Sequence, residues 1–368
     1  MKVIYYFGDQ DTIMHRWPAF HFYDELSRYG VDVELFNPLK FPTLEDANSA
    51  LIRRIEEGDV SLFITPHNHE RLFIDTLKKI KIKGVPTLLK CYDNLTAPFF
   101  HKKIAPFFDL VWLTSIETED LFCGWGANTI FLPYAANPFN FKHFPNIDNG
   151  KMCFIGTPYG SRVNMINAIT DSGFGIDLYS GLSSNMSKIR EFKTPSFESI
   201  ANLMKFSYGR KIILGAVKQK INQPDLAMDK LSLYPNIDYD EMSRIYSNYA
   251  ISLSSTAARN TGVLSKPLHV INLRAFEIPM SGGLQMCSFN PELAEYFKED
   301  EEIIFYRNNK ELQEKMNYYL KEENYDLRIE MKKKARLRAE NEHSWIKRYE
   351  IIFKRMNIKF PVSQIIKG

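Results

Sequence analysis

The chain has 368 residues, of which 45% are hydrophobic and 25% are charged, and this composition predicts a folded globular protein rather than a disordered one. The length predicts two domains of roughly 150 to 200 residues each. The formal net charge of +3 is too small to indicate nucleic-acid binding, and no recognised nucleic-acid-binding module is present. We therefore expect no nucleic-acid partner.

Two further features favour a cytoplasmic protein. No apolar run approaches the ~20 residues needed to cross a bilayer. The first residues, MKVIYYFGDQ, pass from an apolar strand into a polar turn and lack the pattern of a signal peptide. The four cysteines stand singly, without the paired spacing of a zinc site, so we expect reduced thiols.

The first half of the chain alternates apolar strands with helices. An amphipathic helix is expected over residues 17–28, and strands are expected over residues 3–7, 31–35, 60–64, 87–90 and 110–113. Near-continuous apolar strands separated by helices predict a parallel, doubly wound α/β sheet. Residues 132–150, rich in Pro, Asn and Phe, break this pattern and predict a linker between two domains.

A second α/β series follows the linker. Its strands are expected over residues 152–155, 176–179, 211–214, 249–253, 284–287 and 303–305. Two such series predict two Rossmann-like domains in tandem, the first over residues 1–140 and the second over residues 151–342. The lysine- and arginine-rich residues 325–359 have helical periodicity and no helix breaker until Pro361.

A glycine-containing turn opens this second series. It reads Gly-Thr-Pro-Tyr-Gly-Ser-Arg over residues 156–162 and precedes a helical pattern. Glycines let backbone amides approach an anion, and a nearby arginine can neutralise a pyrophosphate. Candidate phosphate-binding residues are therefore Gly156, Thr157, Tyr159 and Arg162. Such turns are common, so an ordinary connection is the alternative interpretation.

The segment 272–295, NLRAFEIPMSGGLQMCSFNPELAE, carries the most information. Helical spacing over residues 273–280, a stop at Gly282 and Gly283, and an apolar run predict a helix, a tight turn and a strand. Ligands in open α/β sheets bind beside such turns. There the carboxylate of Glu277 can accept both hydroxyls of a ribose, while the helix N-terminus beside Arg274 favours phosphate. The alternative is a surface Glu-Arg pair.

Residues 274–312 resemble the C-terminal signature of the CgeB-like, spore-maturation-type glycosyltransferases (glycosyl transferases group 1), a GT-B group that uses nucleotide sugars. The shared elements keep their order: Arg274, Phe276 and Glu277, then Gly282, then Pro-Glu-Leu at 291–293 and an acidic strand at 302–306. The similarity extends less distinctly to residue 151 and weakly to residue 107, which is more than half of the chain.

This resemblance implies the GT-B fold, in which two Rossmann-like domains face a cleft and a C-terminal helix crosses back to the N-terminal domain. That helix would begin near residues 343–345, so residues 343–368 would join the first domain. The resemblance also implies transfer of a sugar from a nucleotide-diphosphate donor to a hydroxyl of a cell-surface glycan or a lipid-linked precursor. In that reaction Glu277 would hold the donor ribose, and Arg162 would contact the donor diphosphate. The helix residue Arg274 and the pair Gly282-Gly283 are candidate donor contacts as well.

One position departs from the resembled pattern. Retaining GT-B transferases often carry a second glutamate eight residues before the ribose-binding one, and here that position is His269. A neutral imidazole can hydrogen-bond a sugar hydroxyl but cannot supply the same charge. His269 is therefore either a donor contact or a residue that satisfies a helix N-terminus, and the stereochemical outcome stays open.

Candidates on the acceptor side follow strands of the first domain: Gly8, Asp9 and Asp11, then His67 and His69, then Asp93 and Asn94. An inverting enzyme needs a carboxylate or a histidine to deprotonate the acceptor hydroxyl. The catalytic candidates are therefore Asp9, His67 and Asp93. Each of these residue types is also common in turns and helix caps.

No metal and no cofactor are expected. The triplet Asp9-Gln10-Asp11 has the spacing of the DxD metal motif of GT-A transferases, but that motif follows several strands, whereas this one follows the first. The guanidinium of Arg162 and a helix N-terminus can balance the pyrophosphate instead of Mg²⁺.

Other interpretations remain open. The basic stretch that contains Lys332, Lys333, Lys334, Arg336 and Arg338 predicts either a solvated helix face or peripheral contact with an anionic membrane that carries the acceptor. A nucleotide-dependent dehydrogenase is disfavoured because the first strand is not followed by G-x-G-x-x-G. A sugar-nucleotide epimerase, or a non-catalytic glycan-binding, nucleotide-binding or coat-assembly protein, could share the fold.

Overall fold

The computed structural model describes residues 1–10, 13–144, 148–180, 197–221, 224–258 and 260–360. The chain forms two compact units. The first unit contains Met1–Asn137 and His343–Gly368, and the second contains Pro138–Glu342. The ranges predicted from the sequence were 1–140 with 343–368 for the first domain and 151–342 for the second, so the linker residues fall mostly in the second unit.

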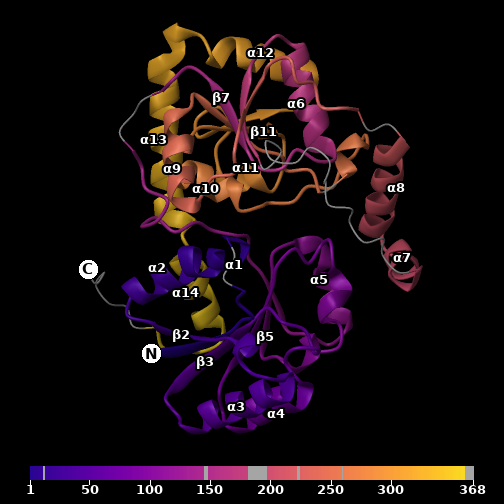
Figure 1. Ribbon diagram of the computed structural model, residues 1–368, viewed down its shortest axis with the longest axis vertical. Coiled ribbons are helices and arrows are strands. Elements are labelled where there is room, and N and C mark those ends of the chain that lie inside the picture. The colour runs from indigo at the N-terminus through magenta and orange to yellow at the C-terminus, as the bar shows by residue number, and fades with distance from the viewer. Residues whose placement is uncertain (11–12, 145–147, 181–196, 222–223, 259, 361–368) are drawn as a thin grey trace. The chain divides into compact units, whose positions relative to one another are not determined.

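The first unit is built on a six-stranded parallel sheet with the strand order β2-β1-β3-β4-β5-β6 (Figure 1). The strands are β1 (Lys2–Tyr6), β2 (Asp32–Phe36), β3 (Val60–Thr65), β4 (Thr87–Cys91), β5 (Leu110–Leu113) and β6 (Thr129–Phe131). The helices are α1 (Ile13–Pro18), which continues through a π-helical turn into α2 (Asp24–Arg28), then α3 (Leu44–Glu56), α4 (Ile74–Ile82), α5 (Glu119–Gly124) and α14 (Trp345–Arg355).

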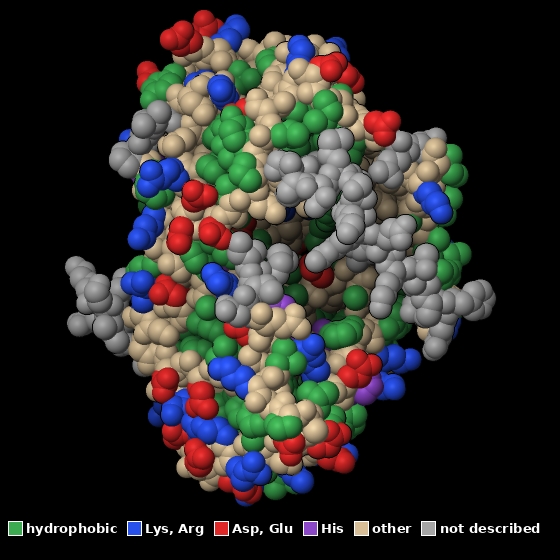
Figure 2. Space-filling view, viewed as in Figure 1, with side chains coloured by type: hydrophobic (Ala, Val, Ile, Leu, Met, Phe, Trp, Pro, Cys, Tyr) green, Lys and Arg blue, Asp and Glu red, His purple; other side chains and the backbone are tan. Residues whose placement is uncertain are grey.

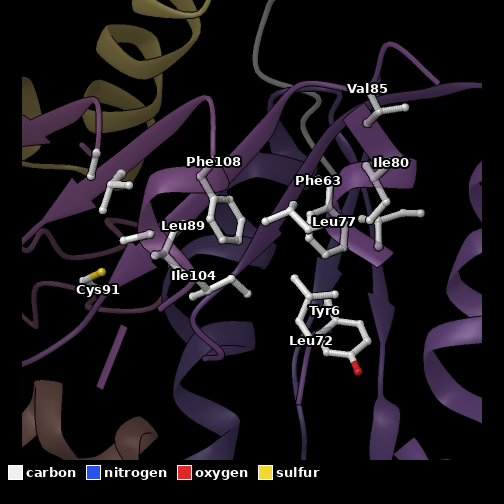
Figure 3. Close-up of a cluster of buried hydrophobic side chains, with 14 of the residues drawn as sticks. Tyr6, Phe63, Leu72, Leu77, Ile80, Val85, Leu89, Cys91, Ile104 and Phe108 are labelled. Atoms are coloured by element: carbon white, nitrogen blue, oxygen red, sulfur yellow. The ribbon is translucent and has the colours of Figure 1, made fainter. Parts of the chain in front are cut away.

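The central strands of this sheet are apolar on both faces because helices cover both faces. On one face, side chains of β1, β3 and β4 pack against α3 and α4. Figure 3 shows this cluster, in which Phe63 lies near Leu77 and Ile80 and Tyr6 lies near Leu72. Thr43 caps the start of α3, because its hydroxyl accepts a hydrogen bond from the amide of Asp46 at 3.1 Å.

Helix α14 covers the opposite face and returns the end of the chain to the first unit, as the GT-B fold implies. The buried carboxyl group of Glu25, on α2, accepts hydrogen bonds from the amides of Trp345 and Ile346, each at 3.1 Å. These amides belong to the first turn of α14 and have no partner within the helix. A side chain 320 residues away in sequence therefore caps α14.

A buried lysine lies beside the same helix. The ammonium nitrogen of Lys90 is 4.1 Å from the ring centroids of Phe22, Trp112 and Trp345. Burial lowers the pKa of Lys90 well below its ordinary value, while the three aromatic faces favour the charged form. The contacts of Lys90 with these aromatic rings connect β4 to β5 and to α14.

The second unit repeats the architecture with the strand order β12-β11-β10-β7-β8-β9. Its strands are β7 (Met152–Ile155), β8 (Ile176–Tyr179), β9 (Leu231–Tyr234), β10 (Ile251–Leu253), β11 (Gln285–Ser288) and β12 (Ile303–Tyr306). Its α-helices are α6 (Ser161–Asp171), α7 (Phe197–Met204), α8 (Ser207–Ile221), α9 (Tyr239–Asn248), α10 (Arg274–Met280), α11 (Leu293–Tyr296), α12 (Asn309–Tyr319) and α13 (Tyr325–Glu342). Side chains of α6 and α12 pack on one face of the sheet, and side chains of α9 and α10 pack on the other.

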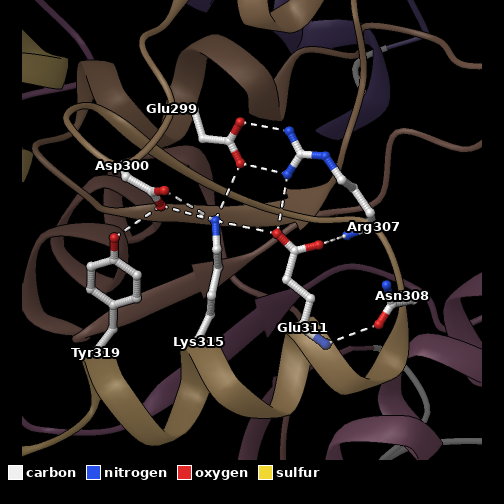
Figure 4. A network of polar contacts seen from close by, with 7 residues as sticks. All are labelled: Glu299, Asp300, Arg307, Asn308, Glu311, Lys315 and Tyr319. Carbon is white, nitrogen blue, oxygen red and sulfur yellow. Dashed lines mark hydrogen bonds and ion pairs between the residues drawn. The ribbon is translucent and has the colours of Figure 1, made fainter.

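Charged side chains fix the connection around β12. Arg307 donates hydrogen bonds to both oxygens of Glu299, each at 2.7 Å, and Lys315 bonds Asp300 at 3.0 Å. Figure 4 shows that Glu311 joins the two halves of this network. The ion pairs are partly exposed, so they order the β12–α12 connection and contribute little each to stability.

One predicted strand is wrong. Residues 211–214 are helical and belong to α8, a helix of 15 residues. A short apolar run such as Ile212–Leu214 fits a buried strand and a helix segment equally well, and here the flanking residues continue a helix. The sequence analysis also missed the short strands β6 and β9, which lie at the edges of their sheets. In the part of the chain that the structure describes, no helix combines the length and the apolar character needed to cross a bilayer.

Candidate functional site

The glycine turn at residues 156–162 lies at the carboxyl end of β7 and leads into α6. Gly156 and Gly160 have φ angles of +135° and +56°, which glycine tolerates and side-chain-bearing residues avoid. A Cβ atom on Gly156 would also lie 2.5 Å from the Arg274 guanidinium. The turn therefore needs glycine both for its backbone conformation and to let Arg274 approach.

Arg274 is held on this turn by its backbone and its side chain. Its Nε donates a hydrogen bond to the carbonyl of Ile155 at 2.8 Å, and its amide donates to Asn272 Oδ1 at 3.1 Å. Asn272 in turn donates to the carbonyl of Ser255 at 2.9 Å. These bonds link the start of α10 to the ends of β7 and β10. The sequence analysis missed Asn272, although Asn is a frequent residue just before a helix.

Arg162 brings a second guanidinium to the same place. It donates a hydrogen bond to the carbonyl of Thr157 at 3.0 Å and lies over the ring of Tyr159, 4.4 Å from its centroid. Burial and then the charge of Arg274 lower the pKa of Arg162 to about 10. Two cations held together at a helix N-terminus create a positive potential that an anion would neutralise.

Glu277 is 4% exposed and lies in α10, three residues after Arg274. This spacing puts both side chains on one face of the helix. Burial, followed by the negative charge of Glu277, raises the pKa of the Tyr239 hydroxyl on α9. Glu277 therefore lies on the face of α10 that also carries Arg274, and its role as a ribose contact stays a prediction.

His269 lies at the same edge of the sheet. Its Nδ1 is 3.4 Å from the hydroxyl of Thr256, which is 3.1 Å from the hydroxyl of Ser288. Thr256 follows β10, the neighbour of β7, and Ser288 ends β11, the strand on the other side of β10. Burial and then the charge of Lys211 lower the pKa of His269, so the imidazole is neutral at neutral pH. The residues predicted to bind the donor thus come from the carboxyl ends of three adjacent strands.

Gly282 and Gly283 end helix α10. Their amides donate to the carbonyls of Pro279 and Ile278, each at 2.9 Å, and Gly282 has a φ angle of +75°. A Cβ atom on Gly282 would collide with His143. These contacts explain both glycines as a helix stop, and their role as donor contacts stays a prediction.

The acceptor-side candidates follow β1, β3 and β4, three adjacent strands of the first unit. His67 Nε2 accepts a hydrogen bond from the amide of Gly8 at 2.8 Å. Burial is the main cause that lowers the pKa of His67 to about 3. A neutral imidazole that already accepts this bond orders the turn after β1, and the geometry disfavours it as a general base.

The two carboxylates differ from His67. Asp93 is exposed and has a φ angle of +50°, and its carboxylate accepts a hydrogen bond from the hydroxyl of Tyr134 at 3.3 Å. The amide of Asp9 donates to Asn37 Oδ1 at 3.2 Å. Asn94 is buried and donates to the carbonyl of Ser115, so it supports the loop after β5. Asp11 lies outside the described residues.

Comparisons with known proteins bear on the fold and on the class of enzyme. Residues 200–354 match a family model described as Glycosyl transferase-like. An α-glucosyltransferase in complex with UDP and a 13-mer DNA has a TM-score of 0.60 at 11% identity, and the match covers 97% of this chain and 99% of that chain. The chain has the GT-B fold, and its residues 200–354 carry a glycosyl transferase-like domain.

Two other solved structures match with a TM-score of 0.54, 12% identity, and coverage of 97% of this chain and 99% of theirs. They are sucrose-phosphate synthase from Thermosynechococcus elongatus and Anabaena HepE in complex with UDP and glucose. These likenesses show the fold, and the family match over residues 200–354 supports a glycosyltransferase enzyme. No curated protein sequence matches this chain.

Proposed function

We propose that this GT-B glycosyltransferase transfers a sugar from a nucleotide-diphosphate donor to an acceptor hydroxyl and belongs to the CgeB-like group. The observation that carries the proposal is the pair of guanidinium groups, Arg162 and Arg274, held at the N-terminus of α6 with the buried Glu277 beside them. The HepE structure that shares the fold is described with UDP and glucose, which supports a diphosphate in the corresponding position.

The donor contacts follow from charge and reach. In our proposal, Arg162 and Arg274 contact the diphosphate, and the amide groups at the start of α6 face its oxygens. Glu277 accepts hydrogen bonds from the two ribose hydroxyls. The neutral His269 contacts a hydroxyl of the sugar.

The arginines would act most strongly as the reaction proceeds. When the bond between the sugar C1 and the diphosphate oxygen breaks, negative charge grows on that oxygen. Positive groups held in place stabilise this charge without rearrangement. We propose that this stabilisation needs no metal ion. Activity that is lost in EDTA and restored by Mn²⁺ would contradict this part of the proposal.

The acceptor is proposed to be a hydroxyl of a cell-surface glycan or of a lipid-linked precursor. In an inverting reaction, Asp93 or Asp9 would take the proton of that hydroxyl. Asp93 is the better candidate because its carboxylate is exposed. One structure that shares the fold is described with DNA, so an oligonucleotide belongs among the acceptors to test.

The decisive experiment mixes the protein with each of several nucleotide-diphosphate sugars and measures the released nucleoside diphosphate with and without glycan, lipid-linked and oligonucleotide acceptors. We expect acceptor-dependent release from one donor, and at least about a hundredfold loss of rate in Arg274→Gln. Arg307→Gln is the matched control because Arg307 belongs to a separate ion-pair network of the same unit. Tight nucleotide binding without turnover of any donor would instead favour the non-catalytic interpretation that His269 keeps open.

A further inference from the structure

Helix α8 carries an exposed apolar stripe. Leu214, Val217 and Ile221 are 50%, 51% and 74% exposed, and their spacing of three and four residues places them on one face of the helix. In Figure 2 hydrophobic side chains appear along the right-hand edge of the molecule, where α8 lies. Three large aliphatic side chains in one exposed row are unusual on a protein surface and mark an interaction site.

The opposite face of α8 is fixed in place, so the stripe cannot rotate inward. Tyr208, Gly215 and Gln219 are buried on that face. A Cβ atom on Gly215 would lie 3.0 Å from the carbonyl oxygen of Asn260, which means that the helix backbone packs directly on the neighbouring loop.

The same segment is strongly basic. Residues 199–224 contain five cationic side chains and no acidic one. None of the five takes part in an ion pair within the described part of the chain. They are Lys205, Arg210, Lys211, Lys218 and Lys220. On the helix, Lys211 and Lys218 border one side of the stripe and Lys220 borders the other.

The basic residues of α13 differ from those of α8. Arg328 and Lys332 pair with the buried Asp148 at 2.7 and 3.6 Å, and Arg338 pairs with Glu302 at 2.6 Å. The cations that the sequence offered for membrane contact are therefore largely neutralised within the second unit. Among the described residues, Lys205 and the four cations of α8 have no such ion pair.

We propose that α8 docks this protein on an anionic lipid surface. An apolar stripe flanked by lysines is the pattern of a helix that lies in the membrane interface, with its aliphatic side chains at the acyl boundary and its lysines among the phosphates. A second copy of the chain fits this face poorly, because it would bring two sets of five cations together. The docking rests on α8 alone and does not depend on the proposed donor or acceptor.

Docking through α8 would also affect the donor side of the enzyme. Gly215 of α8 packs against Asn260 and Thr261, and the next residue, Gly262, packs against Ser161 at the start of α6, so α8 lies next to the edge of the sheet that carries the candidate site. A membrane-bound α8 therefore keeps this edge close to the lipid headgroups.

The test is co-sedimentation of the full chain, without nucleotide, with vesicles of phosphatidylcholine alone or of phosphatidylcholine with phosphatidylserine. We expect binding only with phosphatidylserine, and at least about a tenfold weaker affinity for Val217→Asp and Ile221→Asp. The matched controls are Ile82→Asp and Leu337→Asp, since these side chains are 82% and 61% exposed on other helices. The controls should bind as the unmodified chain does.

A second measurement does not depend on the aspartate variants. Cys123 is exposed and the other three cysteines are buried, so a Cys123→Ser background can carry one new cysteine for an environment-sensitive dye. A dye at position 221 should shift to the blue on anionic vesicles, and a dye at position 82 should not. Three results would overturn the proposal: equal binding to both vesicle types, no shift at position 221, or a self-associated chain that Ile221→Asp makes monomeric without lipid.

Discussion

The cap that Glu25 provides to α14 makes the stability of the first unit depend on pH in a specific direction. Burial raises the pKa of Glu25 to about 8, against an ordinary value of 4.5, and the amides of Ile346 and Trp345 offset only part of this effect. A pKa raised in the folded state means that folding favours the protonated form. The contribution of Glu25 to the free energy of unfolding is therefore fully present below pH 4.5 and is lost as the pH rises through 8.

The size of the effect follows from the shift. Each pKa unit corresponds to about 1.4 kcal/mol, so the difference between 4.5 and about 8 represents about 5 kcal/mol of unfolding free energy across that range. Glu25→Gln cannot ionise and keeps a carbonyl to accept one amide. It should therefore lose this pH dependence and gain stability relative to the unmodified chain as the pH rises.

Tryptophan fluorescence during urea unfolding measures the stability of the first unit, which contains Glu25. All four tryptophans, at positions 17, 112, 125 and 345, lie in the first unit. Glu350→Gln is the control, since that carboxylate on α14 is 45% exposed. Other groups that titrate cancel in the difference between Glu25→Gln and the unmodified chain. If that difference stayed constant from pH 4.5 to 8, the assignment of Glu25 as a buried, protonated cap would be wrong.

Three further predictions concern the candidate site and its supports. Because burial lowers the pKa of His67 from 6.5 to about 3, stability should fall as the pH drops below 6.5, and His67→Gln should remove that part of the acid sensitivity in the same fluorescence assay. Glu277→Ala should weaken nucleotide binding by about 1 to 3 kcal/mol in calorimetric titrations, and an unchanged affinity would remove Glu277 from the site. Gly156→Ala should lower the melting temperature and weaken nucleotide binding by displacing Arg274, whereas Gly124→Ala, where a Cβ atom meets no neighbour within 4 Å, should leave binding unchanged.

The fold was largely predictable from the sequence because buried parallel strands consist of consecutive apolar residues, which a sequence pattern reveals. The predicted ranges 152–155 and 176–179 coincide with β7 and β8. Residues 211–214 were misassigned for the same reason, since an apolar run alone does not separate a strand from a helix. The apolar side chains of that run are partly exposed on α8, and only the three-dimensional structure shows this.

The site was predictable where residues are close in sequence. Arg274 and Glu277 are one helical turn apart, so the sequence could place them together. The contact of Arg274 with Ile155 joins residues 119 positions apart, and no local pattern encodes it. The bond from Gly8 to His67 likewise spans 59 positions, so the sequence alone does not show that the imidazole of His67 already accepts a hydrogen bond.

The most direct test of the central claim is a calorimetric titration of the protein with UDP, GDP, CDP, ADP and dTDP. Our account predicts that one nucleoside diphosphate binds, that Arg162→Gln and Arg274→Gln each weaken this binding at least about tenfold, and that Arg307→Gln leaves it unchanged. Binding that is equal in all of these variants, or no binding of any nucleoside diphosphate, would contradict the proposed donor site.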